Sequence, residues 1–227
     1  MKLIHERISD YAAAFPEKAV AEDPFGKISY GELEARSASL AAALAARGFE
    51  NGDAAAVYVP FVKEIVLGAV TAIRAGGVFV PFDDAYPAER LEYMLEDSEA
   101  KAVLTLREFW ENKKLKFPEE RVVFMDDAPV GSGEPVPAGG LSEDSPAMLL
   151  YTSGTTGKPK GVLHSHRMLL HIADFMNAQE GAEMDSDSRS GIMTGFTFMG
   201  SEIFVWAPLV KGGTVCISQE VARKDLG

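Results

Sequence analysis

The sequence has a single cysteine and lacks both a long hydrophobic run and a signal-like start. Cys216 cannot form an internal disulfide, and the N-terminal residues MKLIHERISD have no apolar core of the kind found in signal peptides. We therefore expect a cytoplasmic protein. The most apolar stretch, residues 65–82, is interrupted by Arg74, Gly76, Gly77 and Pro81, so the sequence predicts no transmembrane segment and no membrane partner.

Basic residues are also scarce. The chain has 22 lysines and arginines against 34 aspartates and glutamates, which gives a net charge of −12. This charge opposes the phosphate contacts on which non-specific nucleic-acid binding depends, so nucleic acid is not expected as a partner. What remains is the composition of a globular protein, because 47% hydrophobic residues in a chain of 227 can form a substantial core.

A helix is predicted near the start of the chain. Ser29 and Glu32 have the spacing of a capping box, apolar residues then recur at helical intervals over 33–44, and Gly48 can end the run. The patterns that follow predict a strand at 54–59, a helix at 64–75 ending at Gly76, a strand at 78–82, a helix beginning at Pro87, strands at 102–105, 122–125, 148–151, 192–194 and 214–217, and helices at 165–177 and 201–210. This alternation predicts an α/β fold with mostly parallel sheets flanked by helices.

Two pairs of acidic residues and one pair of histidines raise the question of a metal site. Asp83–Asp84 and Asp126–Asp127 lie in turn-like contexts in which aspartate caps the backbone, so a structural role is favoured. His164 and His166 stand two residues apart, but no carboxylate or cysteine cluster supplies the remaining ligands. We therefore expect no metal site made by these residues.

The segment YTSGTTGKPKG, residues 151–161, follows an apolar strand and precedes an amphipathic helix. Its glycines allow tight turns that present amide hydrogens, its hydroxyls add donors, and Lys158 and Lys160 add positive charge. Together these groups could hold phosphate oxygens. The segment is not a Walker-type loop, because Pro159 follows Lys158 where that pattern has Ser or Thr. From the residues alone, a flexible connection between two elements is the alternative.

This segment resembles, nearly position for position, the phosphate-binding loop of the adenylate-forming superfamily, which includes acyl-CoA synthetases, luciferases and nonribosomal peptide synthetase adenylation domains. Three further segments match in the same order: residues 28–48, 73–105 and 198–217. Of these, residues 73–105 are most similar to peptide-synthetase and D-alanine-activating adenylation domains. The resemblance implies that residues 1–227 are a partial N-terminal AMP-binding domain of the acyl-adenylate-forming, acetyl-CoA synthetase-like fold.

The resemblance also implies a function. It is ATP-dependent activation of a carboxylic acid, an amino acid or a related acid, as an acyl-AMP for transfer to a phosphopantetheine thiol of a carrier protein or to CoA. Lys160 matches the phosphate-contacting lysine of the loop and is the expected catalytic residue. The residues that inherit contacts to the β and γ phosphates of ATP are Thr152, Ser153, Gly154, Thr155, Thr156, Gly157 and Lys160.

Further residues match the acyl pocket of the family. Phe198 falls at the wall between the acyl pocket and the pantetheine tunnel, although a core phenylalanine at a strand end is the alternative. Met199 aligns where amino-acid-activating relatives usually carry an aspartate for the α-ammonium of the substrate, and sliding the alignment would put Thr197 there instead. His166 matches a histidine for which packing or capping is favoured over proton transfer.

Several segments of the family do not occur in these 227 residues. They are the adenine-binding Tyr-Gly-Pro-Thr-Glu segment, the ribose-binding aspartate, the carboxylate for Mg²⁺, the hinge and the mobile C-terminal domain with its catalytic lysine. We therefore expect an incomplete piece that is inactive alone, and the competing interpretation is a non-catalytic remnant that at most binds nucleotide or a protein partner. Because strands near residues 20–60 pair in the family with later sequence, we also expect unpaired edges there and a homo-oligomer.

Overall fold

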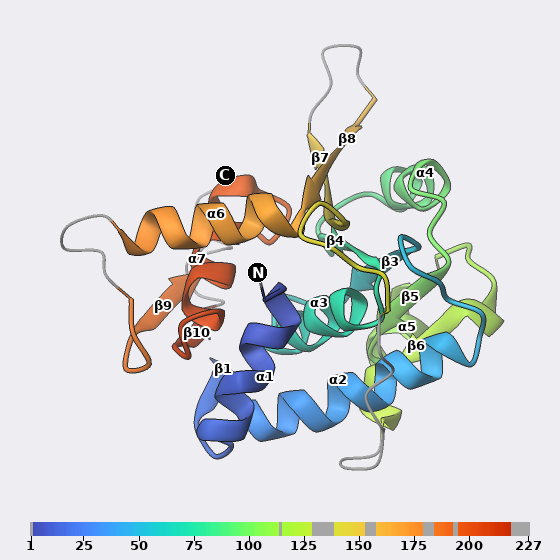
Figure 1. Ribbon diagram of the computed structural model, residues 1–227. Helices are drawn as coiled ribbons and strands as arrows, with labels where there is room; N and C mark the ends of the chain where they lie inside the picture. Colours follow the sequence, from blue (N-terminus) through green and yellow to red (C-terminus); the bar gives the residue numbers. More distant parts are fainter. Residues whose placement is uncertain are drawn as a thin grey trace, which may run out of the picture.

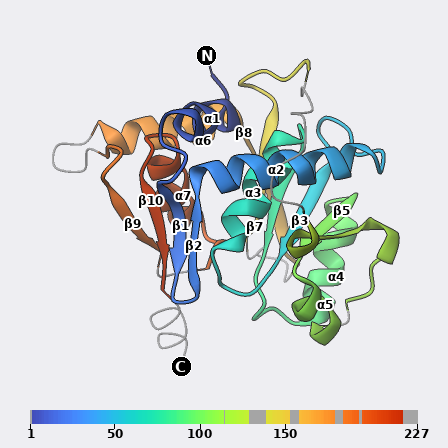
Figure 2. The ribbon, with the colours of Figure 1, turned by 90° about the horizontal axis from the view of Figure 1, so that it is seen from below.

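The computed structural model describes residues 2–113, 115–128, 139–152, 158–178, 184–192 and 195–218. Its strands form two separate sheets, with helices between them and on the outer face of the larger one (Figures 1 and 2). The four-stranded sheet has the order β2-β1-β10-β9, and the six-stranded sheet has the order β6-β5-β3-β4-β7-β8.

The smaller sheet consists of β1 (Ala19–Asp23), β2 (Gly26–Ser29), β9 (Arg189–Ile192) and β10 (Thr214–Ile217). The larger sheet consists of β3 (Ala54–Tyr58), β4 (Val78–Phe82), β5 (Ala102–Thr105), β6 (Val122–Phe124), β7 (Pro146–Thr152) and β8 (Lys160–Ser165). All neighbouring strands are parallel except the pairs β1–β2 and β7–β8. The prediction of an α/β fold with mostly parallel sheets is confirmed.

The α-helices of the described residues are α1 (Ile4–Ala14), α2 (Tyr30–Ala45), α3 (Glu64–Arg74), α4 (Ala88–Asp97), α5 (Arg107–Lys113), α6 (His166–Asn177) and α7 (Met199–Leu209), with short 3-10 helices η1 (Glu119–Arg121) and η2 (Met125–Asp127). The predicted cap of α2 is present, because the Ser29 hydroxyl accepts a hydrogen bond from the amide of Glu32 at 3.1 Å. The Glu32 carboxylate, however, binds Arg36 instead of completing a capping box. Gly76 has a φ of +82°, which explains why α3 stops just before it.

Two cores share the larger sheet. On one face, Ala55 and Val57 of β3 contact the core that includes α1, α2, α3, α6 and α7 and reaches the smaller sheet. On the other face, Ala56 and Tyr58 pack with α4 and α5. Side chains of β3 alternate between these cores because successive residues of a strand point to opposite faces. Burial on both faces accounts for the continuous apolar run of β3.

The expectation of unpaired strands near residues 20–60 is wrong for two of the three strands there. β1 lies between β2 and β10, since Ala21 pairs with Val215, and β3 lies between β5 and β4. The chain itself therefore provides these neighbours, and only β2 lies at an edge. In the described part of the chain, no helix is long and apolar enough to cross a membrane.

Candidate functional site

The carboxyl ends of β3, β4 and β7 lie at one edge of the larger sheet, because these strands are parallel. Ligands of open α/β sheets bind at this edge. β7 extends past its pairing with β4 and pairs with β8, the edge strand of the larger sheet, in a hairpin that projects from the body of the molecule (Figure 1). The segment 151–161, singled out from the sequence, is therefore carried by this hairpin.

The loop end of the β7–β8 strand pair brings two of the predicted phosphate contacts together. Thr152 and Lys160 are direct partners in the β7–β8 pair, and the Thr152 hydroxyl donates to the Lys160 carbonyl oxygen at 3.3 Å. Both residues are exposed. Side chains of direct partners lie on the same face of a strand pair, so the hydroxyl and the ammonium can reach one ligand. The predicted contacts Ser153, Gly154, Thr155, Thr156 and Gly157 lie outside the described residues.

Lys158 and Lys160 supply positive charge at the loop end of the hairpin. Neither Lys158 nor Lys160 forms an ion pair with a carboxylate of the described residues. The Lys158 ammonium lies 5.5 Å from the centre of the Tyr93 ring, a distance typical of a cation–π contact. In a chain of net charge −12, two lysines without a carboxylate partner in the described residues, near the exposed hydroxyl of Thr152, favour an anionic ligand.

The hairpin is anchored on its other side by α4. The Tyr151 hydroxyl donates to Asp97 at 2.8 Å, and the Tyr93 hydroxyl donates to the second oxygen of the same carboxylate at 3.1 Å. Burial, with the Asp97 contact, raises the pKa of the Tyr151 hydroxyl, so the hydroxyl keeps its proton and acts as a donor.

The segment that matches the acyl pocket lies at the same edge of the sheet. A small cavity of about 30 Å³ is lined by residues after β3 and β4 together with Gly195 and Phe196. The Tyr86 hydroxyl donates to the hydroxyl of Thr197 at 3.1 Å. Phe198 precedes α7 and is 65% exposed, so it is not a core residue at a strand end. Met199 is the first residue of α7.

One aspartate of each acidic pair caps the backbone, as predicted, and the other pairs with a basic side chain. Asp83 accepts a hydrogen bond from the amide of Ala85 at 2.9 Å, and Asp126 accepts from the amide of Arg107, the first residue of α5, at 3.1 Å. Asp127 pairs with the side chain of Arg107. Among the described residues, no three His, Cys, Asp or Glu side chains are placed to hold a metal ion.

The two histidines are buried. His166 begins α6, its ring lies edge-on to that of His5 with 6.1 Å between centroids, and burial lowers its pKa to about 4. This agrees with the favoured packing role. His164 has its Nδ1 3.1 Å from the sulfur of Met168, and burial lowers its pKa too. Both imidazoles are therefore neutral near pH 7.

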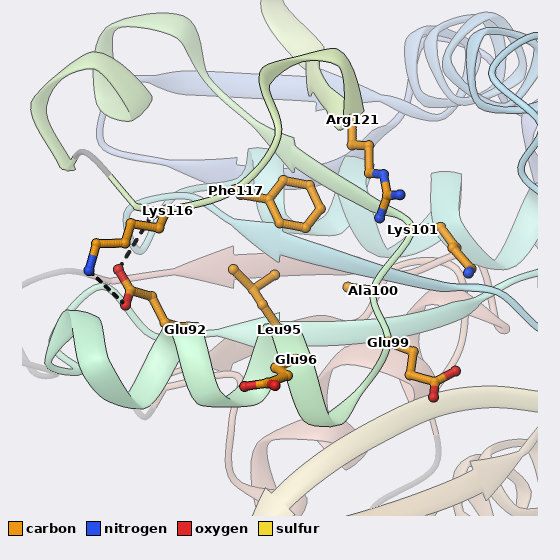
Figure 3. Close-up of a pocket in the computed structure, with 9 residues that line it drawn as sticks. All are labelled: Glu92, Leu95, Glu96, Glu99, Ala100, Lys101, Lys116, Phe117 and Arg121. Carbon is orange, nitrogen blue, oxygen red and sulfur yellow. Dashed lines mark hydrogen bonds and ion pairs between the residues drawn. The ribbon is translucent and has the colours of Figure 1, made fainter.

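A larger cavity lies elsewhere. It has a volume of about 490 Å³ and lies between α4 and the chain that leads into β6 (Figure 3). Its walls carry charges of both signs, and Glu92 and Lys116 form an ion pair across it at 3.8 Å. None of the site residues that the sequence predicts lines this cavity.

Comparison with known protein families identifies the family to which the chain belongs. A model described as AMP-binding enzyme matches residues 8–227. The chain belongs to the AMP-binding enzyme family. This AMP-binding chain is 30% identical over 228 residues to tyrocidine synthase 3 of Brevibacillus parabrevis, covering 99% of this chain and 3% of that protein. It is 31% identical over 218 residues to syringomycin synthase SyrB1 of Pseudomonas syringae pv. syringae, covering 94% of this chain and 34% of that protein.

Solved structures agree on the fold of the AMP-binding chain. The nonribosomal peptide synthetase FmoA3 superposes with a TM-score of 0.83 at 25% identity, covering 98% of this chain and 23% of that one. VinN in complex with 3-methylaspartate superposes with a TM-score of 0.82 at 24% identity, covering 96% of this chain and 62% of that one. The fold is therefore that of the N-terminal part of an acyl-adenylate-forming enzyme. The chain spans less than two thirds of the length of each of these relatives.

Three residues near the site were missed from the sequence. Tyr93 and Asp97 belong to the segment 73–105 that carries part of the resemblance, but nothing in that segment indicates which distant residue they contact. Glu202 is fully buried in α7, one helical turn after Met199, and burial raises its pKa to about 8. A lone acid within the apolar run from Met199 to Leu209 is the pattern that could have revealed it.

Proposed function

We propose that this AMP-binding chain is part of an enzyme that activates a carboxylic acid with ATP. In the reaction a carboxylate oxygen attacks the α phosphorus, the bond from that phosphorus to the β-γ pyrophosphate breaks, and acyl-AMP and pyrophosphate result. The observation that supports this most directly is the pairing of Thr152 with Lys160 at the loop end of the β7–β8 hairpin. The Thr152 hydroxyl donates to the backbone carbonyl oxygen of Lys160, and the Lys160 ammonium forms no ion pair with a carboxylate of the described residues. Both residues follow the carboxyl end of the sheet, where ligands of α/β folds bind.

The hairpin would hold the leaving pyrophosphate. Lys160 would neutralise charge that develops on the β and γ phosphates, and Thr152, with Ser153, Gly154, Thr155, Thr156 and Gly157, would donate hydrogen bonds to them. Donors fixed before the reaction stabilise the transition state without reorganisation. Mg²⁺ would supply further charge neutralisation.

The acyl group would then pass to a thiol, either a carrier-protein phosphopantetheine or CoA. The exposed ring of Phe198, at the start of α7, is consistent with a wall between the acid and the entering thiol. A cytoplasmic location and self-association of the chain remain predictions.

The acid itself would be one without an α-amino group, or an amino acid held in an unusual way. Neither Met199 nor Thr197, the two residues that align with the usual aspartate, can neutralise an α-ammonium. A desolvated ammonium without its counter-charge binds poorly.

The test is acid-dependent exchange of pyrophosphate into ATP by the full-length protein that contains this sequence. Lys160→Ala is expected to slow exchange tenfold or more, because a hydrogen bond to a charged group contributes roughly 1.5–3 kcal/mol. Lys101→Ala, an exposed lysine before β5, is the matched control and should keep the wild-type rate. Exchange that does not depend on any acid, or that survives Lys160→Ala, would contradict the proposal. Nucleotide binding without exchange would favour the non-catalytic alternative.

A further inference from the structure

The carboxylate of Asp97 bonds directly to a residue of β7 and, through Tyr93, reaches the residue just before β8. Asp97 is the last residue of α4, and its two oxygens accept from two tyrosines. Tyr151 lies directly before Thr152 in β7. The Tyr93 hydroxyl donates its one proton to Asp97 and lies in contact with the carbonyl oxygen of Pro159, 3.4 Å away and directly before Lys160. One side chain is thus linked to the residue next to each described phosphate contact.

We propose that Asp97 is a positioning residue, which fixes the spacing of Thr152 and Lys160 through Tyr151 and Tyr93. This rests on the proposed function of the hairpin. In this proposal Asp97 does not contact the ligand, and its role is to fix the positions of Thr152 and Lys160, which do.

The charge of Asp97 is the first argument for a positioning role. A carboxylate close to a polyphosphate site repels the ligand, so its electrostatic effect on binding is unfavourable. No Lys, Arg or His of the described residues forms an ion pair with it. What Asp97 offers is two acceptor oxygens in a fixed arrangement, and ionised acceptors make the stronger hydrogen bonds.

The unequal burial of the two tyrosines is the second argument. Tyr151 is only 4% exposed and packs in the core between α4 and the larger sheet, so the position of its hydroxyl is set by the core. Tyr93 is partly exposed, and Lys158 lies over its ring. The core holds Tyr151 in place, whereas Tyr93, which lies against Pro159, is held less firmly. Asp97 accepts hydrogen bonds from both hydroxyls and so fixes Tyr93 relative to Tyr151.

The opposite face of α4 provides a matched control. Glu92 lies one turn before Glu96 on the face that lines the large cavity, and it pairs with Lys116 rather than with the hairpin (Figure 3). Glu92→Gln removes a charge from the same helix without touching Tyr151 or Tyr93. A second control, Tyr30→Phe, removes a buried hydrogen bond far along the chain and so tests for loss of stability alone.

The experiment measures the affinity of the 227-residue chain for inorganic tripolyphosphate and for ATP, together with amide hydrogen exchange at Thr152, Lys158 and Lys160. Asp97→Asn keeps one acceptor oxygen and loses the other, so affinity should fall about fivefold and exchange at the three amides should become faster. Tyr151→Phe should also lower the affinity and speed amide exchange. The double variant should lose little more than either single variant, because both substitutions remove the same Tyr151–Asp97 hydrogen bond.

The outcomes separate the two proposals. If the wild type binds tripolyphosphate and Asp97→Asn binds as well as Glu92→Gln, the positioning role of Asp97 is wrong while the function of the hairpin stands. If Tyr30→Phe loses as much affinity as Asp97→Asn, the effect is one of stability and the positioning role is again contradicted. If the wild type binds neither tripolyphosphate nor ATP, the proposed function fails, and the role of Asp97 fails with it.

Discussion

The Tyr30 hydroxyl donates a hydrogen bond to the carbonyl oxygen of Gly213 at 2.8 Å, across 183 positions of sequence. Tyr30 begins α2, and Gly213 directly precedes β10. The ring is fully buried, and burial raises the pKa of the hydroxyl, so it stays a donor. This bond joins the N-terminal helices to the last strand of the smaller sheet.

Tyr30→Phe is expected to destabilise the chain. The substitution leaves a buried carbonyl without its donor, which costs about 1–2 kcal/mol and lowers the melting temperature by roughly 2–8 °C for a chain of this size. Thermal unfolding followed by circular dichroism measures the change. Tyr11→Phe is the control, because its ring packs 6.2 Å from that of Tyr30 while no hydrogen bond of its hydroxyl is found in the described residues. Equal melting temperatures for the two variants would contradict this role of Tyr30.

His166 should make the chain sensitive to acid. Burial, and then the neighbouring His5, lower the pKa of His166 from 6.5 to about 4 in the folded state. Between these pH values the unfolded chain binds a proton that the folded chain excludes, so the free energy of unfolding should fall as the pH drops from 6.5 towards 4. Denaturant unfolding at several pH values measures the slope. His166→Gln should flatten it, whereas the exposed His171→Gln should leave it unchanged; the opposite pattern would refute the assignment.

Glu202 should act in the other direction. Its folded-state pKa of about 8, against an ordinary 4.5, means that the folded chain holds a proton that the unfolded chain releases between these values. The free energy of unfolding should therefore fall as the pH rises from 4.5 towards 8. Glu202→Gln stays neutral and should be the more stable protein at pH 8, while Glu108→Gln, on exposed α5 surface, should follow the wild type. A Glu202→Gln curve parallel to the wild type would count against a buried, protonated Glu202.

Met199 should determine how poorly α-amino acids are activated. In the full-length protein, Met199→Asp is expected to raise pyrophosphate exchange with α-amino acids tenfold or more, since each 1.4 kcal/mol of ammonium stabilisation is about tenfold in affinity. Met199→Leu changes the side chain without adding charge and should give no gain. The measurement is acid-dependent pyrophosphate exchange with a set of acids, in which each α-amino acid is compared with the matching deaminated, hydroxy and aryl acids. If the wild type prefers an α-amino acid and Met199→Asp gives no gain, the argument from this position fails.

Elements with strong local patterns were predicted closely from the sequence. β4 and β10 have the predicted bounds, and α3 stops before Gly76 as expected, because the apolar period and the glycine are local features. β8 was missed, since the four residues from Lys160 to Leu163 are exposed and show no alternation. An edge strand that buries few side chains leaves little pattern in the sequence.

Long-range pairing could not be predicted from these local patterns. The pairing of Ala21 with Val215 closes the smaller sheet, and neither strand contains information about its partner. The same holds for the site. Thr152 and Lys160 were identified by the loop pattern, whereas the contact of Tyr151 with Asp97 depends on how α4 packs against β7.

The central claim is that the β7–β8 hairpin binds the phosphates of ATP. The most direct measurement is backbone-amide NMR of the 227-residue chain titrated with ATP, inorganic tripolyphosphate, AMP and adenosine. We expect ATP and tripolyphosphate to shift the amides of Thr152, Lys158 and Lys160 with similar affinity, and adenosine to shift none of them, because these residues are proposed to contact the phosphates. Shifts confined to the charged cavity at Glu92 and Lys116, or equal shifts with adenosine and ATP, would contradict the claim.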